Sequence, residues 1–233
     1  MSKGAVRTIL LVHGAYVDGS SWARVIPLLE AAGYAVVAVQ NPLLSLEEDV
    51  DALKRALDNA EPPVLLVAHS WGGVVITEAG DDPRVAGLVY VAAGAPNAGQ
   101  SFVEMGKDYP SESGRANVRQ TDPEGFVSLS RDGMIRYFAP DLPESETRVM
   151  AATQVPTAAA AFATKLTNAA WKTKPSWYVI AGEDKMLSPA LQQALVEKIG
   201  AQSITLPAGH AVMLSRPAEV AAFIVEAAKG ASR

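Results

Sequence analysis

The chain has no cysteine among its 233 residues. Disulfide bridges, thiolate nucleophiles and cysteine-based metal sites are therefore excluded. Disulfides are typical of secreted proteins, so their exclusion fits a cytoplasmic protein. The first residues, Met1 to Gly4, lead directly into a predicted strand and leave no room for a secretory signal. We therefore expect a cytoplasmic location.

Long apolar runs and a strong charge of one sign are also missing. No apolar stretch approaches the roughly 20 residues that a membrane-spanning helix needs, so no membrane partner is expected. The net charge is −5, from 20 basic and 25 acidic residues, with no basic block, so nucleic acid is not an expected partner. With 49% hydrophobic and 19% charged residues, the chain suits one large globular domain.

The segment from residue 64 to residue 75 organises the rest of the chain. Val64 to Val67 form an apolar, β-branched run that predicts a buried strand, and residues 74–79 are compatible with a helix. Small residues at Ala68 and Gly72 would allow a sharp turn that exposes Ser70 at the end of the strand. This pattern predicts a nucleophile elbow; the alternative is a simple turn with serine as a helix N-cap.

Strands and helices are predicted to alternate on either side of this segment. Besides the elbow strand, predicted strands cover residues 6–12, 34–39, 86–92, 177–181 and 203–206. Predicted helices run from Asp18 to Gly33 and over residues 46–57, 74–79, 189–199 and 217–228. Such alternation indicates an α/β fold with a mostly parallel sheet and helices on both faces.

The alternation stops between residues 98 and 172, where prolines, short amphipathic pieces and aromatic residues follow one another. We interpret residues 98–172 as an inserted, mainly helical cap, because a linker would lack apolar anchors. The core would then comprise residues 1–97 and 173–233. Ligands bind at the carboxyl ends of the strands in such sheets, so the cap is expected to cover the site.

A serine nucleophile needs a general base, which is most often histidine. Of the three histidines, His13 lies in the turn after the first strand and His69 stands beside Ser70. Only His210 follows the last predicted strand and precedes the last helix, which is the position expected of the base. His13 is expected to be structural.

The base needs a carboxylate to orient it, and two candidates follow the strand at residues 177–181. We choose Asp184, with Glu183 as the neighbouring alternative. The resulting order of serine, aspartate and histidine is typical of α/β-hydrolases. The developing oxyanion would be bound by the backbone N–H groups of Trp71, which follows the nucleophile, and Ala15, in the turn after the first strand.

The walls of the substrate pocket are less clearly marked. Tyr16, Trp71, Phe138, Phe162 and Met213 are candidates for the pocket, with a role in the core as the alternative for each. The apolar clusters of the cap favour short, largely uncharged esters. No histidine has a second histidine three or four residues along, so neither a metal nor another cofactor is expected.

Four segments carry a resemblance to a known family: LLVHGAYVDGSSW, AHSWGG, AGEDKM and AGHAVMLSRP. They resemble compact bacterial α/β-hydrolases similar to plant methyl-ester esterases and hydroxynitrile lyases. The resemblance implies a cofactor-free esterase with Ser70, Asp184 and His210 as its triad. Ala68 replaces the first elbow glycine, and Ser188 stands where that family often has proline.

The predicted function is hydrolysis of a small carboxylic ester through an acyl-enzyme, with that ester as the partner. One alternative is a lyase that cleaves a C–C bond, such as that of a cyanohydrin, and needs a cation near His210; Lys185 is the nearby lysine. The other is a ligand-binding module without turnover, for which an intact triad is unnecessary. The oligomeric state is open, with a homodimer as one expectation.

Overall fold

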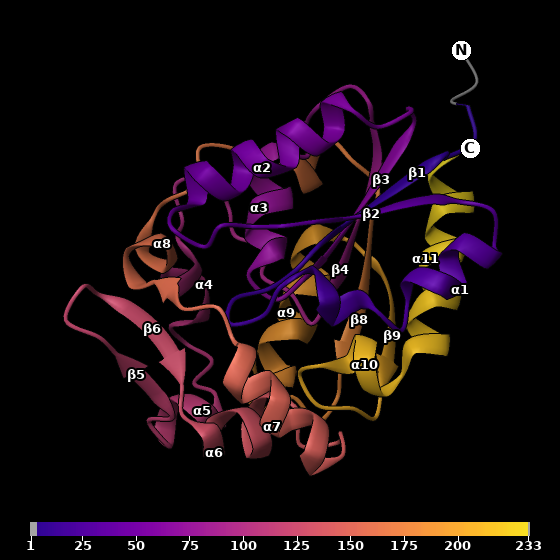
Figure 1. Cartoon of the computed structure of the whole chain (residues 1–233). Helices are drawn as coiled ribbons and strands as arrows, with labels where there is room; N and C mark the ends of the chain where they lie inside the picture. Colours follow the sequence, from indigo (N-terminus) through magenta and orange to yellow (C-terminus); the bar gives the residue numbers. More distant parts are fainter. Residues whose placement is uncertain (1–3, 233) are drawn as a thin grey trace.

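The computed structural model describes residues 4–232 and contains a parallel sheet of six strands in the order β2-β1-β3-β4-β8-β9 (Figure 1). The strands are β1 (Thr8–Val12), β2 (Ala35–Val39), β3 (Val64–His69), β4 (Val85–Val91), β8 (Ser176–Ala181) and β9 (Gln202–Leu206). Every neighbouring pair in this sheet is parallel. The predicted parallel sheet is confirmed.

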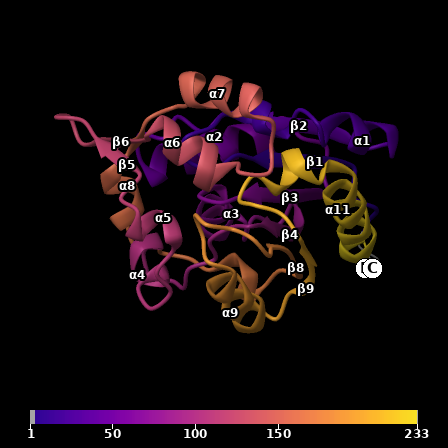
Figure 2. The same cartoon turned by 90° about the horizontal axis from the view of Figure 1, so that it is seen from below.

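Helices cover both faces of this sheet (Figures 1 and 2). One face carries α2 (Leu46–Asp58), α3 (Gly72–Ala79) and α9 (Pro189–Ile199); the other carries α1 (Ile26–Ala31), α10 (Val212–Ser215) and α11 (Pro217–Ala231). Strand β1 contributes side chains to both faces, since Leu10 and Val12 point into one core while Ile9 and Leu11 point into the other. This alternation follows from the two-residue period of a strand.

The first predicted helix is divided in the structure. A 3₁₀ turn at Gly19–Trp22 is followed by the separate helix α1. Pro27 in the first turn of α1 has no backbone N–H and could not donate to the carbonyl of Ala23, so one continuous helix is disfavoured. Asp18 caps the 3₁₀ turn by accepting from the backbone N–H of Ser20 at 2.7 Å.

All six strands of the large sheet lie outside residues 98–172, and the segment between them mixes helices with a second sheet. Its helices are α4 (Phe102–Gly106), α5 (Glu112–Arg115), α6 (Arg131–Gly133), α7 (Glu144–Thr153) and α8 (Ala159–Ala163), with a π-helical turn at Met134–Phe138 and a 3₁₀ turn at Ala170–Lys172. The antiparallel strands are β5 (Arg119–Thr121), β6 (Phe126–Leu129) and β7 (Thr157–Ala158). Helix predominates as expected, but the small sheet was not predicted, because strands of two to four residues show too little alternation.

The arrangement of strands sets the position of the site. The chain runs from β1 to β2 at one edge and then returns to place β3 on the other side of β1. The loops after β1 and β3 therefore leave the sheet in opposite directions and open a crevice at its carboxyl end. The cap is fastened beside this crevice by backbone hydrogen bonds from Val155 to Tyr16 at 3.2 Å and from Ala158 to Leu43 at 2.9 Å.

Within residues 4–232, none of the helices combines the length and the apolar character needed to cross a bilayer.

Candidate active site

Ser70 lies at a sharp turn between β3 and α3. Its φ of +51° is in the left-handed region, which non-glycine residues rarely adopt. The start of α3 passes so close to β1 that a β-carbon at Gly72 would lie 2.5 Å from the carbonyl oxygen of Val12. The turn therefore has the geometry of a nucleophile elbow, with glycine required at residue 72.

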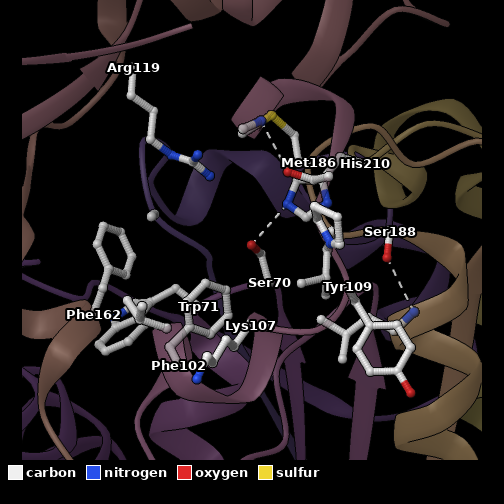
Figure 3. Close-up of a pocket in the computed structure, with 18 of the residues that line it drawn as sticks. Ser70, Trp71, Phe102, Lys107, Tyr109, Arg119, Phe162, Met186, Ser188 and His210 are labelled. Carbon is white, nitrogen blue, oxygen red and sulfur yellow. Dashed lines mark hydrogen bonds between the residues drawn. The ribbon is translucent and has the colours of Figure 1, made fainter. Parts of the chain in front are cut away.

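A continuous chain of hydrogen bonds joins Ser70, His210 and Asp184. Nε2 of His210 lies 2.8 Å from Oγ of Ser70, and Nδ1 lies 2.7 Å from Oδ2 of Asp184 (Figure 3 shows the first of these). A carboxylate only accepts hydrogen bonds, so Nδ1 carries the proton and Nε2 is left to accept from the serine hydroxyl. The structure thus brings together the three residues that the sequence selected.

Asp184 is enclosed by donors. Its Oδ1 accepts from the backbone N–H groups of Met186 at 2.7 Å and Leu187 at 2.9 Å, while its Oδ2 accepts from Nε2 of Gln192 at 2.8 Å as well as from His210. Four hydrogen bonds of this kind hold the carboxylate in one orientation. Gln192, on the inner side of α9, is a supporting residue that the sequence reading missed.

His210 is held from behind by a second histidine and a phenylalanine. Nε2 of His69 donates to the backbone carbonyl of His210 at 2.9 Å, and the ring of Phe138 meets the His210 ring edge-on at 5.1 Å. Burial lowers the pKa of His69 well below its usual value, with the nearby His210 as a smaller cause. His69 therefore stays neutral and places no positive charge beside His210.

Ala15 and Trp71 line the same crevice as Ser70. Among residues 4–232, no protein acceptor takes the backbone N–H of either residue. The loop that carries Ala15 lies very close to the elbow. A β-carbon added to Gly14 would lie only 2.8 Å from Cβ of Ser70. These two N–H groups are thus available to a bound oxygen atom near Ser70.

His13 takes no part in this arrangement. Its Nδ1 donates to the backbone carbonyl of Gly14 at 2.8 Å, and its Nε2 accepts from the backbone N–H of Asn41 at 2.9 Å. Burial lowers its pKa. His13 therefore braces the loop after β1. In the part of the chain that the structure describes, no three His, Asp or Glu side chains gather as metal ligands.

A cavity of about 580 Å³ opens above Ser70 and His210 (Figure 3). Tyr16 and Phe162, both expected in the pocket, contribute to its wall together with Phe102 and Leu191. Phe162 stacks edge-on against Trp71 at 5.3 Å, which joins the cap to the elbow.

Two of the expected pocket residues lie elsewhere. Phe138 is 1% exposed and packs against the His210 ring, so it supports that side chain without lining the cavity. Met213 is fully buried in the core between the sheet and α11. The prediction that Phe138 and Met213 line the pocket is therefore wrong. An apolar side chain carries no local signal that separates a pocket wall from a core position.

The cap also brings charged residues to the cavity. Lys107, Arg115 and Arg119 are among the residues that line it. The expectation of an apolar inner face therefore holds only for part of the wall. Sequence spacing gave no sign of this cluster, because the cap folds back on itself between these residues.

Asp49 is a further residue that sequence reading missed. It lies on α2, is fully buried and accepts from Nε1 of Trp71 at 2.7 Å and from the backbone N–H of Leu43 at 2.8 Å. Burial raises its pKa to about 6, despite the opposing effect of these hydrogen bonds. The carboxylate fixes the indole of the residue that directly follows Ser70.

The raised pKa of Asp49 predicts a pH-dependent stability. Between pH 4 and 6 the unfolded chain has released this proton while the folded chain still holds it, so the free energy of unfolding falls as the pH rises. Relative to Asp49→Asn, the wild type should lose roughly 2 kcal/mol between pH 4 and 7. Urea unfolding of both proteins at several pH values measures this difference. Parallel curves would show that Asp49 ionises at its ordinary pKa.

The six-stranded parallel sheet, the elbow and the serine–histidine–aspartate chain define the α/β-hydrolase class of protein. The sequence profile of the "Alpha/beta hydrolase family" matches residues 9–223, and the chain belongs to this family.

Curated relatives extend over almost the whole chain. It is 29% identical to "Alpha/beta hydrolase nvfD" of Aspergillus novofumigatus, over 94% of this chain and 96% of that protein. It is 26% identical to "Methylesterase 7" of Arabidopsis thaliana, over 98% of each. It is 27% identical to "Pyrethroid hydrolase" of Sphingobium wenxiniae, over 95% of this chain and 87% of the relative.

Solved structures agree on the fold. A pyrethroid hydrolase from Sphingobium faniae JZ-2 superposes with a TM-score of 0.80 at 24% identity, covering 96% of this chain and 98% of the other. Polyneuridine aldehyde esterase superposes with the same TM-score of 0.80 at 20% identity, covering 95% of this chain and 98% of that one. These likenesses include the cap, since such coverage leaves no room to omit it.

Proposed function

We propose that the protein is a serine hydrolase that cleaves small carboxylic esters through an acyl-enzyme. The observation that carries this proposal is the hydrogen-bonded chain from Ser70 through His210 to Asp184 at the floor of a cavity. A serine hydroxyl is a weak nucleophile near neutral pH, and a histidine within hydrogen-bond distance supplies the base that activates it.

In the proposed reaction, Oγ of Ser70 attacks the ester carbonyl while Nε2 of His210 takes the hydroxyl proton. The carbonyl oxygen becomes an oxyanion, which the backbone N–H groups of Ala15 and Trp71 bind. Asp184 stabilises the imidazolium and keeps its orientation. Collapse of the intermediate breaks the C–O bond, and His210 returns the proton to the departing alcohol.

Water then completes the cycle. His210 removes a proton from a water molecule as that water attacks the acyl carbon, and the second intermediate collapses to release the carboxylic acid and restore the Ser70 hydroxyl. No step needs a metal or an organic cofactor, so EDTA should leave the rate unchanged.

The names of several relatives support ester cleavage. They include "Methylesterase 7", "Polyneuridine aldehyde esterase" and "Carbendazim hydrolyzing esterase", which are 26%, 22% and 27% identical to this chain. The identities are too low to transfer a substrate, so we take from them only the reaction class.

The two alternatives have less support. Lys185, on which the lyase interpretation depends, lies with its Nζ 5.9 Å from the centre of the Tyr137 ring and does not line the cavity. A module that only binds a ligand has no need for the four donors that hold Asp184 in place.

A fluorophosphonate probe is expected to add its mass to the peptide that contains Ser70. The loss of ester hydrolysis should match the fraction of protein that is labelled. Among the serines that the structure describes, only Ser70 has a histidine within hydrogen-bond distance, whereas Ser111 and Ser188 line the same cavity without one. Peptide mass spectrometry locates the adduct. An adduct on Ser111 or Ser188, or release of cyanide from a cyanohydrin by a protein that the probe does not label, would contradict the proposal.

A further inference from the structure

The cavity above Ser70 carries positive charge in a protein whose net charge is −5. Lys107 from the end of α4, Arg115 from α5 and Arg119 from β5 all line it, and no acidic side chain from residues 4–232 does. The three basic residues come from separate elements of the cap, yet they converge on one space. The excess of positive charge is therefore confined to this cavity.

These charges are not neutralised by the protein. Among residues 4–232, no carboxylate forms an ion pair with Lys107, Arg115 or Arg119, although basic residues elsewhere, such as Arg84 and Lys165, do have acidic partners. Unpaired cationic side chains that line a cavity raise the local concentration of anions and favour their binding.

Arg119 is the best positioned of the three. Its Nε donates to the phenol oxygen of Tyr16 at 3.2 Å, and Figure 3 shows its side chain reaching toward the space above Ser70 and Trp71. A guanidinium has five N–H donors. The hydrogen bond to Tyr16 uses the one on Nε, so the two terminal nitrogens remain free to hold a planar oxyanion through two parallel hydrogen bonds.

Tyr16 gives Arg119 a rigid support. Its backbone has a φ of +69°, and its N–H donates to Oγ1 of Thr157 at 3.4 Å, so the loop after β1 and the cap hold it from two sides. Burial raises the pKa of the Tyr16 phenol, which therefore keeps its proton. Tyr16 directly follows Ala15, so its side chain links Arg119 to the loop that carries one of the proposed oxyanion donors.

We propose that the natural ester carries a second, ionised carboxylate at the far end of its acyl chain, and that Arg119, assisted by Lys107 and Arg115, binds it. This inference rests on the proposed esterase function and specifies its substrate class: monoesters of dicarboxylic acids. It departs from the sequence-based expectation of an uncharged ester. The apolar wall of Phe102, Phe162 and Leu191 would hold the methylene chain between the two ends.

The test compares two esters with the same number of carbon atoms in the acyl chain. Monomethyl adipate ends in a carboxylate where methyl hexanoate ends in a methyl group. Wild-type protein is expected to hydrolyse monomethyl adipate with the higher kcat/KM, and 0.5 M salt should reduce this preference because the three cations are exposed to solvent.

Substitutions then test whether Arg119 causes the preference for monomethyl adipate. Arg119→Gln should lower the ratio of the two kcat/KM values by about tenfold, mainly through KM for the adipate. Arg119→Lys keeps the charge and should restore part of the ratio. Lys185→Gln is the matched control, because this lysine belongs to the same region but does not line the cavity, and it should leave the ratio unchanged.

The outcomes separate this inference from the function on which it rests. A wild-type protein that hydrolyses methyl hexanoate as well as or better than monomethyl adipate would overturn the inference and leave the esterase proposal standing. So would a ratio that Arg119→Gln does not change. A protein that hydrolyses neither ester and is not labelled by the fluorophosphonate would overturn both.

Discussion

Ser70→Ala is expected to lower kcat for ester hydrolysis by about 10⁴- to 10⁶-fold while the fold stays intact. The substitution removes only Oγ, which lies 2.8 Å from Nε2 of His210. Alanine has the same β-carbon as serine, so it fits the turn at a φ of +51° as well as serine does. Initial rates on a p-nitrophenyl ester, with a thermal melt of the same preparation, measure both parts of the prediction.

Ser188→Ala is the matched control for this experiment. Ser188 lines the same cavity, but its hydroxyl accepts from the backbone N–H of Leu191 and caps α9. Its loss should cost about 1 kcal/mol of stability and leave the rate close to that of the wild type. A Ser70→Ala protein that keeps more than a tenth of the activity would remove Ser70 from the mechanism.

Asp184→Asn is expected to lower kcat by roughly 10⁴-fold. All four groups around this carboxylate donate hydrogen bonds to it, two to each oxygen. Asparagine must turn its NH₂ toward one of these pairs. Facing His210, the amide would favour the wrong tautomer of the imidazole; facing Met186 and Leu187, it would leave two buried N–H groups unpaired.

This prediction includes a loss of stability, because each unpaired buried donor costs about 1–3 kcal/mol. Glu183→Gln is the control: Glu183 is exposed, and its side chain makes no contact with His210. The control should retain nearly full activity and the wild-type melting temperature. Equal damage from the two substitutions, or greater damage from Glu183→Gln, would mean that the orienting carboxylate has been assigned to the wrong residue.

Local sequence signals were sufficient to predict secondary structure where one short segment determines its own conformation. Helix α9 has the bounds that the sequence predicts, because Ser188 caps its start, Pro189 suits its first turn and Gly200 adopts the left-handed conformation that ends it. The buried strand β3 is equally clear, since its run of β-branched and leucine side chains has no polar face.

Local signals failed where the partner of a residue lies far along the chain. In the cap, Val127 of β6 pairs with Thr157 of β7, and the whole of α7 lies between these two strands in the sequence. Phe138 and Met213 are apolar in either a pocket or a core, so only their neighbours in space decide between the two.

The sequence by itself determined the elbow around Ser70, the order of Ser70, Asp184 and His210, and the parallel sheet that presents them. Each depends on a pattern within a few residues: strand, small residues, helix, or a polar residue at the end of a strand. The Ser70–His210–Asp184 geometry then follows from the sheet, because parallel strands end at the same edge.

Only the tertiary structure decided what surrounds these residues. Asp49 reaches Trp71 across 22 positions of the chain, and Arg119 reaches Tyr16 across 103. Such contacts arise from the packing of α2 on the sheet and from the path of the cap over the crevice. The sequence around Asp49 or Arg119 does not show these contacts, because the burial and the hydrogen-bond partners of a side chain depend on the whole fold.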